Sequence, residues 1–244
     1  MTEFALGMDI SRWDGLFDAE KAKAAGISFV WIKSSQALFT DSWFVRNWAI
    51  AKAAGLIRGA YHYLDWSCSG LSQGNYFWNL IKDDPGELPP CVDFEQRRLL
   101  DIPRGDEHGH LSNCLSAIKA PKAAIYSSRN YFERYGTASE AWLKYDLWNV
   151  TVYYSPYPAN TSPYPVIPWG NNWKFWQWTF KANGPQYGTS TTKEVDLDFF
   201  NGTVEELRNY ANVSVPPVPI PVPTWAEAMT TWARGLGYTG PGPE

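Results

Sequence analysis

Residues 22–27 read Ala-Lys-Ala-Ala-Gly-Ile, and residues 51–56 repeat them as Ala-Lys-Ala-Ala-Gly-Leu. Each copy predicts a helix end, because alanine and lysine favour helices and glycine tolerates the left-handed conformation that closes one. An apolar run follows each copy, at residues 28–33 and 57–64. A helix, a glycine and a strand that return after about thirty residues are typical of successive βα units on a parallel sheet. Chance likeness of two alanine-rich helix ends is the alternative.

The alternation of strands and helices continues along the chain, and the last strands have few helices between them. Further strands are predicted at residues 5–10, 91–95, 123–126, 147–153, 173–179 and 194–199, and helices at 71–82, 109–119 and within 129–145. A last helix opens at Thr203, whose capping-box partner is Glu206. We therefore expect an α/β fold, an irregular TIM-like barrel of about eight strands, with early βα units and helix-poor closing strands.

The composition changes at Val213. Residues 215–223 read Val-Pro-Pro-Val-Pro-Ile-Pro-Val-Pro, a polyproline-type spacer. We expect a barrel domain over residues 1–212, a Pro-rich linker over 213–224 and a short tail or helix over 225–244. A tail that packs on the barrel is the alternative.

The overall charge and composition exclude several partners. The net charge is −4, which disfavours nucleic acid, and no basic run or long apolar run favours a membrane. The spacing of Cys68, Cys91 and Cys114 fits neither a disulfide framework nor a zinc site, so we expect free thiols, no metal and no cofactor. The first residues lack the pattern of a signal peptide.

Two carboxylates lie close together in the predicted strand Cys-Val-Asp-Phe-Glu at residues 91–95. Alternate strand residues share a face, so Asp93 and Glu95 project together, at the end of the barrel where active sites form. Repulsion and burial raise one pKa and leave a proton donor beside an anion, which glycoside hydrolysis requires. A solvated acid pair at a strand end is the alternative.

Acids on two other strands strengthen the prediction. Asp9 ends the first predicted strand, and Asp196 lies in the last. The first and last strands of a closed barrel are neighbours, so these side chains should approach each other at the mouth. Asp198 shares the face of Asp196 and is a second acid there.

A series of segments in one order resembles the family 25 glycoside hydrolases, the phage- and fungal-type lysozymes that cut peptidoglycan. The segments are Gly-Met-Asp-Ile-Ser at 7–11, Ile-Lys-Ser-Ser-Gln at 32–36, Gly-Ala-Tyr-His-Tyr at 59–63, Leu-Pro-Pro-Cys-Val-Asp-Phe-Glu at 88–95, Ile-Tyr-Ser-Ser at 125–128, Phe-Trp-Gln-Trp-Thr at 175–179 and Val-Asp-Leu-Asp-Phe-Phe-Asn-Gly at 195–202. The resemblance covers most of the chain and implies five βα units followed by three strands that close the barrel.

The resemblance also implies roles for the acids. Glu95 matches the general acid, and Asp93 matches the neighbour that attacks the anomeric carbon or steadies the substrate's own N-acetyl group as it attacks. Asp9 and Asp196 match two supporting carboxylates. Asp198 stands where asparagine is common in relatives, so it is a further candidate.

Other matching positions are candidates for substrate binding. They are Tyr61 and Tyr126, which match cleft tyrosines, Lys33 and Gln177, which lie in matching segments, and the possible sugar-stacking tryptophans Trp66, Trp148, Trp169 and Trp176. Ordinary core packing is the alternative for the aromatic residues.

We expect a monomeric muramidase that cleaves the β-1,4 bond between N-acetylmuramic acid and N-acetylglucosamine in bacterial peptidoglycan. The cell wall is its place of action, and a phage lysin, released by lysis machinery or carried on the virion, its expected origin. The tail would attach the enzyme to another module or particle. A non-catalytic glycan-binding or virion structural module is the alternative. An N-acetylglucosaminidase would have an additional Asp where Cys91 stands.

Overall fold

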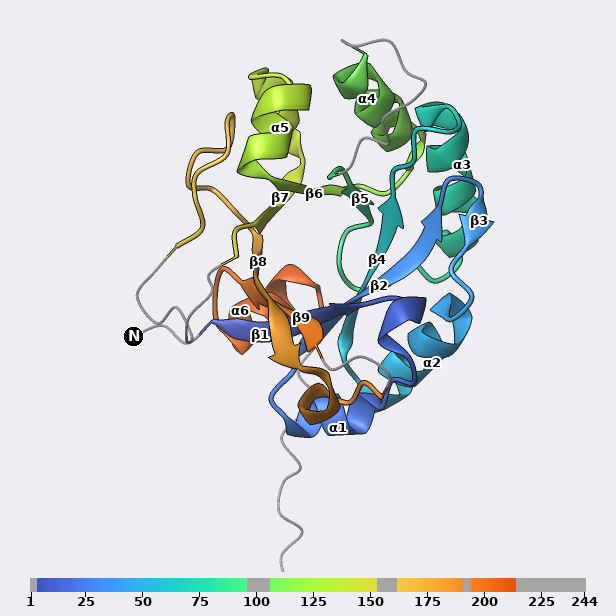
Figure 1. The fold of residues 1–244 in the computed structure, drawn as a ribbon, viewed down its shortest axis with the longest axis vertical. Helices are drawn as coiled ribbons and strands as arrows, with labels where there is room; N and C mark the ends of the chain where they lie inside the picture. Colours follow the sequence, from blue (N-terminus) through green and yellow to red (C-terminus); the bar gives the residue numbers. More distant parts are fainter. Residues whose placement is uncertain (1–3, 96–105, 153–161, 191–193, 214–244) are drawn as a thin grey trace, which may run out of the picture. The chain divides into compact units, whose positions relative to one another are not determined.

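The structure, a computed structural model, describes residues 4–95, 106–152, 162–190 and 194–213, and its strands close into a ring (Figure 1). The strands are β1 Ala5–Ile10, β2 Phe29–Gln36, β3 Phe39–Thr40, β4 Ile57–Tyr63, β5 Cys91–Asp93, β6 Ala124–Ser128, β7 Asp146–Val150, β8 Phe175–Asn183 and β9 Glu194–Phe200. Parallel pairs run from β1 through β2 and β4 to β8, and β9 closes the ring by antiparallel pairing with both β8 and β1. β3 only flanks β2. The predicted eight-stranded barrel is confirmed.

Helices follow the first five ring strands and thin out afterwards, as predicted. They are α1 Ala19–Ala24, α2 Phe44–Ala54, α3 Gly70–Ile81, α4 Glu107–Ala117, α5 Arg129–Tyr135 and α6 Val204–Tyr210, with the 3-10 helices η1 Arg12–Asp14, η2 Glu140–Lys144 and η3 Gly184–Tyr187. Gly26 and Gly55 follow α1 and α2 with φ of 96° and 72°, which confirms the two helix ends of the repeat. The capping box of Thr203 and Glu206 opens α6.

Strand side chains divide into two apolar cores. Those that face outward, such as Val30 and Val92, belong to the main apolar cluster, which also includes side chains of the surrounding helices. Aromatic rings fill the barrel itself. Trp31 stacks on Trp148 with ring centroids 4.8 Å apart, and Phe175 meets Trp31 edge-on at 5.2 Å.

Two glycines make room for these rings. A Cβ on Gly59 would lie 2.2 Å from the Trp31 ring, and one on Gly7 would lie 2.3 Å from the Phe29 ring. The aromatic packing plugs the barrel below the C-terminal ends of its parallel strands. A site for a ligand is therefore left at those ends, where sites on such barrels form.

Some expectations lie outside the described residues or change in detail. The predicted linker and tail, apart from Val213, are not described, so their division from the barrel domain stays a prediction. The three cysteines, all described, are free thiols as predicted. Within the described ranges, no helix is long and apolar enough to cross a membrane.

Candidate active site

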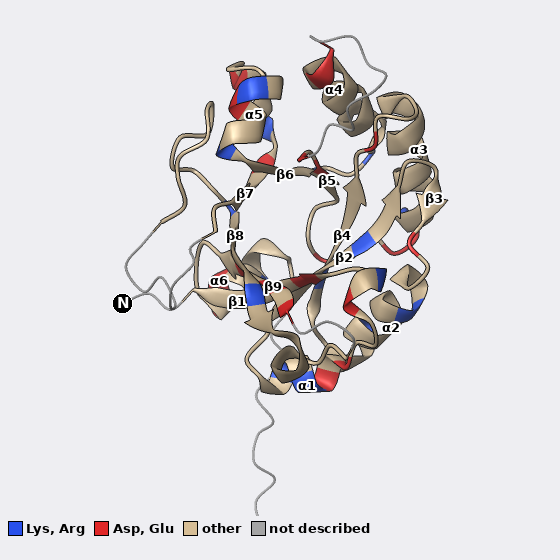
Figure 2. Ribbon diagram, in the orientation of Figure 1, with Lys and Arg blue, Asp and Glu red and all other residues tan. Residues whose placement is uncertain are grey.

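A pocket of about 150 Å³ opens at the C-terminal ends of the parallel strands. It is lined by Asp9, Ser11, Trp13, Lys33, Tyr61, Tyr63, Asp93, Glu95, Tyr126, Trp148 and Asp196. The four acids predicted to converge therefore share one pocket with the predicted lysine and both tyrosines. Figure 2 shows acidic positions on β5 and β9 and a basic one on β2.

The acid pair comes from the end of β5. Asp93 is the last residue of the strand and is buried, whereas Glu95 lies two residues further out and is partly exposed. Burial raises the pKa of both carboxyls, and Glu95 raises that of Asp93 further. The Lys33 ammonium lowers the pKa of both. The raised pKa values favour one carboxyl that keeps its proton beside one that is ionised, so the pair can supply an acid and an anion together.

Asp9 and Asp196 are direct register partners across β1 and β9. Burial raises the pKa of Asp9 well above its ordinary range, and Asp196 and Asp198 add to the shift. Burial, then Asp14 and Glu95, raise the pKa of Asp196 to about 7. The predicted approach of the first and last strands at the mouth is confirmed.

Lys33 is the cation among the described residues that line the pocket. Its Nζ donates to Gln36 Oε1 at 2.9 Å and lies 4.5 Å from the centre of the Tyr63 ring. Gln36 Nε2 in turn donates to Asp65 Oδ2 at 3.0 Å. Burial lowers the pKa of Lys33, while Asp93 opposes that shift. This chain of contacts holds the ammonium group near the acid pair.

Gln177 connects Tyr126 on β6 with Asp9 on β1 through hydrogen bonds. Tyr126 Oη donates to Gln177 Oε1 at 2.6 Å, and Gln177 Nε2 donates to Asp9 Oδ2 at 3.2 Å. Gln177 is buried and does not line the pocket, so it positions these groups rather than meeting a ligand. Burial raises the pKa of Tyr61 and Tyr126 well above the usual range, which keeps both phenols protonated.

Asp198 lies inside the barrel, and it is not among the residues that line the pocket. It is fully buried and accepts a hydrogen bond from Trp148 Nε1 at 2.8 Å. Its Oδ2 has no hydrogen-bond partner among the described residues, and burial raises its pKa well above the usual range. Asp198 therefore supports Trp148, which does line the pocket, instead of contacting a ligand directly.

Trp176 is a correction to the predicted ligand contacts. Its indole is fully buried, donates to Thr151 O at 2.8 Å and packs against Trp173 and Phe199. Neighbouring strand residues face opposite sides, so Trp176 faces outward when Gln177 faces inward.

The other tryptophans proposed to stack on sugar differ in where they lie. Trp66 stacks on His110, and Trp169 packs on Phe132 and donates to Tyr145 O. Both are buried in the apolar cluster around the barrel. Trp148 alone of the four lines the pocket, although most of its surface is also covered.

Sequence reasoning missed three lining residues, Ser11, Trp13 and Tyr63. Ser11 and Trp13 belong to the short turn after β1, where no periodic pattern indicates which side chains face the mouth. Tyr63 is two residues beyond Tyr61 on β4, and strand alternation places both on the same face. That alternation was a usable signal for Tyr63.

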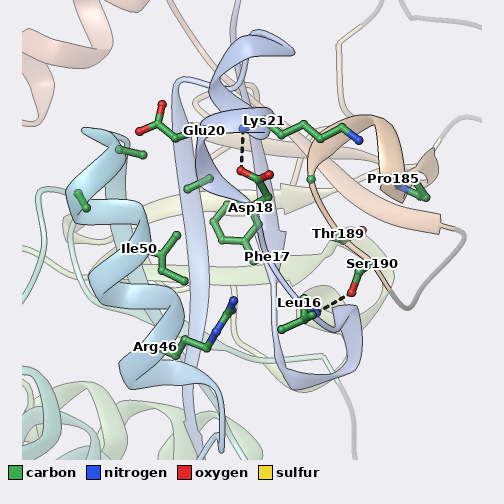
Figure 3. Close-up of a pocket in the computed structure, with 14 residues that line it drawn as sticks. Leu16, Phe17, Asp18, Glu20, Lys21, Arg46, Ile50, Pro185, Thr189 and Ser190 are labelled. Carbon is green, nitrogen blue, oxygen red and sulfur yellow. Dashed lines mark hydrogen bonds between the residues drawn. The ribbon is translucent and has the colours of Figure 1, made fainter.

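A larger hollow of about 700 Å³ lies elsewhere, between α1, α2 and the segment around η3 (Figure 3). Two of its polar groups serve local structure. Asp18 Oδ1 accepts the Lys21 N–H at the start of α1, and Ser190 Oγ accepts the Leu16 N–H. Asp9, Asp93, Glu95 and Asp196, all with a raised pKa, line the smaller pocket, so that pocket is the candidate for chemistry.

Comparison with known proteins identifies the family of the chain. Residues 8–186 match the family described as Glycosyl hydrolases family 25. YegX of Escherichia coli O6:H1 is 30% identical over 220 residues, covering 84% of this chain and 73% of that protein. Lysozyme M1 of Streptomyces globisporus is 29% identical over 224 residues, covering 84% and 71%. A solved family 25 glycosyl hydrolase from Bacillus anthracis superposes with a TM-score of 0.70 at 26% identity, covering 86% of this chain and 94% of that one. The chain therefore belongs to glycosyl hydrolases family 25 and is a glycoside hydrolase.

Proposed function

We propose that the protein hydrolyses bacterial peptidoglycan at the β-1,4 bond between N-acetylmuramic acid and N-acetylglucosamine. The observation that carries the proposal is the convergence of Asp9, Asp93, Glu95 and Asp196 in one pocket of a family 25 barrel. Lysozyme M1 and a solved muramidase from Acremonium alcalophilum, 26% identical with a TM-score of 0.68, support the choice of substrate.

Glu95 is the proton donor in this proposal. It lies further out than Asp93 and is partly exposed, so its carboxyl can reach a glycosidic oxygen. Burial raises its pKa, which favours the protonated form that a general acid needs. Transfer of that proton to the leaving oxygen lets the C–O bond break as positive charge develops at the anomeric carbon.

Asp93 lies beside Glu95 and stabilises that positive charge. As an anion it either attacks the anomeric carbon or accepts a hydrogen bond from the substrate's N-acetyl group while that group attacks. Its Oδ1 is buried and has no hydrogen-bond partner among the described residues, so no neighbour there competes with either role. Water then completes hydrolysis, with Glu95 taking back a proton.

The surrounding groups set the charge of the site. Asp9 and Asp196 are neighbours on adjacent strands, and the raised pKa of each limits how many negative charges the pocket carries at once. Lys33 adds a positive charge that lowers the pKa of both members of the acid pair. The pocket therefore keeps protons for transfer and enough negative charge to stabilise an oxocarbenium-like centre.

Digestion of purified peptidoglycan tests the proposal. We expect new N-acetylmuramic acid reducing ends by mass spectrometry, and Glu95→Gln should lower the rate by at least about a thousandfold. Glu140→Gln removes an exposed carboxyl on η2 and should retain full activity. New N-acetylglucosamine ends would assign a glucosaminidase, and release of no ends by the intact protein would assign a non-catalytic glycan-binding module.

We also propose that the protein acts on the cell wall as a monomeric phage lysin, with residues 213–224 as a spacer to a segment that attaches it to another module or particle. The Pro-rich run at 215–223 supports the spacer, because such runs hold two parts of a chain apart. Purified protein added to intact bacteria should reduce culture turbidity. Unchanged turbidity, when isolated walls are digested, would exclude action as a lysin from outside the cell.

A further inference from the structure

Trp13 combines exposure with a place in the catalytic pocket. Its residue surface is 67% exposed, the second highest among the large apolar residues described as exposed, yet it lines the same pocket as Asp93 and Glu95. The aromatic residues Tyr61, Tyr126 and Trp148 of that pocket are buried. Trp13 is therefore the aromatic surface of the pocket that a ligand can cover most fully.

The backbone that carries Trp13 is held by several hydrogen bonds. The Trp13 N–H donates to Ser11 Oγ at 3.2 Å, and Ser11 N–H donates to Asp14 Oδ2 at 2.8 Å, which closes a capping box around η1. The Arg12 N–H donates to Asp41 Oδ2 at 3.3 Å. These bonds fix the turn before any ligand arrives, so little conformational entropy remains to be lost on binding.

Arg12 supports one side of the indole. Its guanidinium carbon lies 4.5 Å from the centre of the Trp13 ring, the geometry of a cation–π contact. Trp13 keeps its high exposure with that contact in place, so the ring still has surface for a second partner. A flat apolar surface beside a hydroxyl-rich and carboxyl-rich pocket suits a pyranose, whose ring has apolar C–H faces and polar edges.

The strand order places this surface across the mouth from the acid pair. β1, which leads into η1, is separated from β5 by β2 and β4 one way round the ring and by four strands the other way. A sugar ring on Trp13 and a glycosidic oxygen at Glu95 therefore belong to neighbouring parts of one glycan chain.

We propose that Trp13, supported by Arg12, is a stacking platform for the pyranose ring of an N-acetylated sugar next to the cleaved bond. This inference rests on the proposed function and adds a binding residue to it. The platform acts in binding and takes no part in proton transfer. Its removal should therefore weaken substrate affinity much more than it slows the chemical step.

Calorimetry can measure the platform without hydrolysis. The probe is a tetrasaccharide of alternating N-acetylglucosamine and N-acetylmuramic acid, titrated into the Glu95→Gln protein. Adding Trp13→Ala should weaken binding about tenfold, and Trp13→Phe should restore most of the loss because a ring is present again. Leu16→Ala, another exposed apolar residue of the same segment that does not line the pocket, should leave binding unchanged.

Kinetics with intact Glu95 give the second measurement. Trp13→Ala should raise KM about tenfold and change kcat by less than about threefold. In calorimetry, the proposed platform would be contradicted if Trp13→Ala did not change the tetrasaccharide affinity of the Glu95→Gln protein. It would also be contradicted if the Glu95→Gln protein did not bind the tetrasaccharide. A failed hydrolysis assay with a Trp13-dependent affinity would instead overturn the proposed function and leave the platform standing. Circular dichroism and thermal unfolding check that each variant is folded.

Discussion

At the scale of single residues, the position of each proton determines what the pocket can do. Asp9, Asp93, Glu95 and Asp196 were predictable, because strand alternation and barrel closure bring them to one mouth. Their neighbours were less predictable. Gln177, from a segment that matches the family, and Trp176, as a sugar-stacking residue, were both candidates for the site, although adjacent strand residues face opposite sides.

Lys33→Met should shift the pH dependence of hydrolysis upward. Its ammonium lowers the pKa of Asp93 and Glu95, so its loss raises both values. The acid limb, where the anion is lost, and the alkaline limb, where the donor is lost, should both move up by roughly one pH unit. The measurement is kcat/KM on soluble glycan between pH 3 and 9. The control is Lys82→Met, which removes an exposed lysine outside the pocket. An unmoved profile for Lys33→Met would exclude this electrostatic role.

At the scale of helices and strands, boundaries followed local chemistry closely where glycine or a capping residue marked them. β1 and the start of α6 agree with the sequence pattern. The predicted helical region 129–145 is divided, because α5 ends before Gly136 and η2 begins at Glu140. The short β3 was not predicted. Its two residues pair only with the end of β2, too few for a periodic signal.

Gly59→Ala should destabilise the barrel. The new methyl would lie 2.2 Å from the Trp31 ring, which is stacked on Trp148 and cannot retreat without disturbing the packed interior. The free energy of unfolding should fall by about 1–3 kcal/mol or more in chemical denaturation. Gly109→Ala is the matched control. Its Cβ meets the flexible end of the Asp106 side chain, and alanine favours helices, so the change should be neutral or stabilising. Equal stability of Gly59→Ala and the parent would contradict the packing argument.

At the scale of the whole molecule, the closed barrel could be predicted because the βα rhythm and the final strands allowed few other topologies. The arrangement with two apolar cores could not be predicted from the sequence. Alternating strands predict two faces, but they do not show that aromatic rings would plug the lower interior and leave only a small pocket of about 150 Å³ above. The buried acids inside that barrel reduce the stability of the whole fold at neutral pH.

Asp198→Asn should stabilise the protein increasingly as pH rises from 4 to 8. The folded-state pKa of Asp198 is raised, so its favourable contribution is present below its unfolded pKa of about 3.9 and is lost as pH rises. Asparagine can still accept the Trp148 N–H. Burial of His62 lowers its pKa to about 4 and gives the opposite trend, so the informative quantity is the difference in Tm between variant and parent at each pH.

Asp83→Asn, which removes an exposed carboxyl, serves as the control for that comparison. A Tm difference between Asp198→Asn and the parent that stays constant from pH 4 to 8 would exclude a titrating Asp198 as the source of the instability.

The antiparallel strand β9 has a consequence for synthesis of the protein. Asp9 leaves the ribosome early, but its register partner Asp196 is encoded near the far end of the barrel domain. Neither β8 nor β1 has its final neighbour until β9 is available. The set of four acids is therefore incomplete in the nascent chain during most of translation. The ability to cut a glycan arises in one late step, when the last strand pairs with the first.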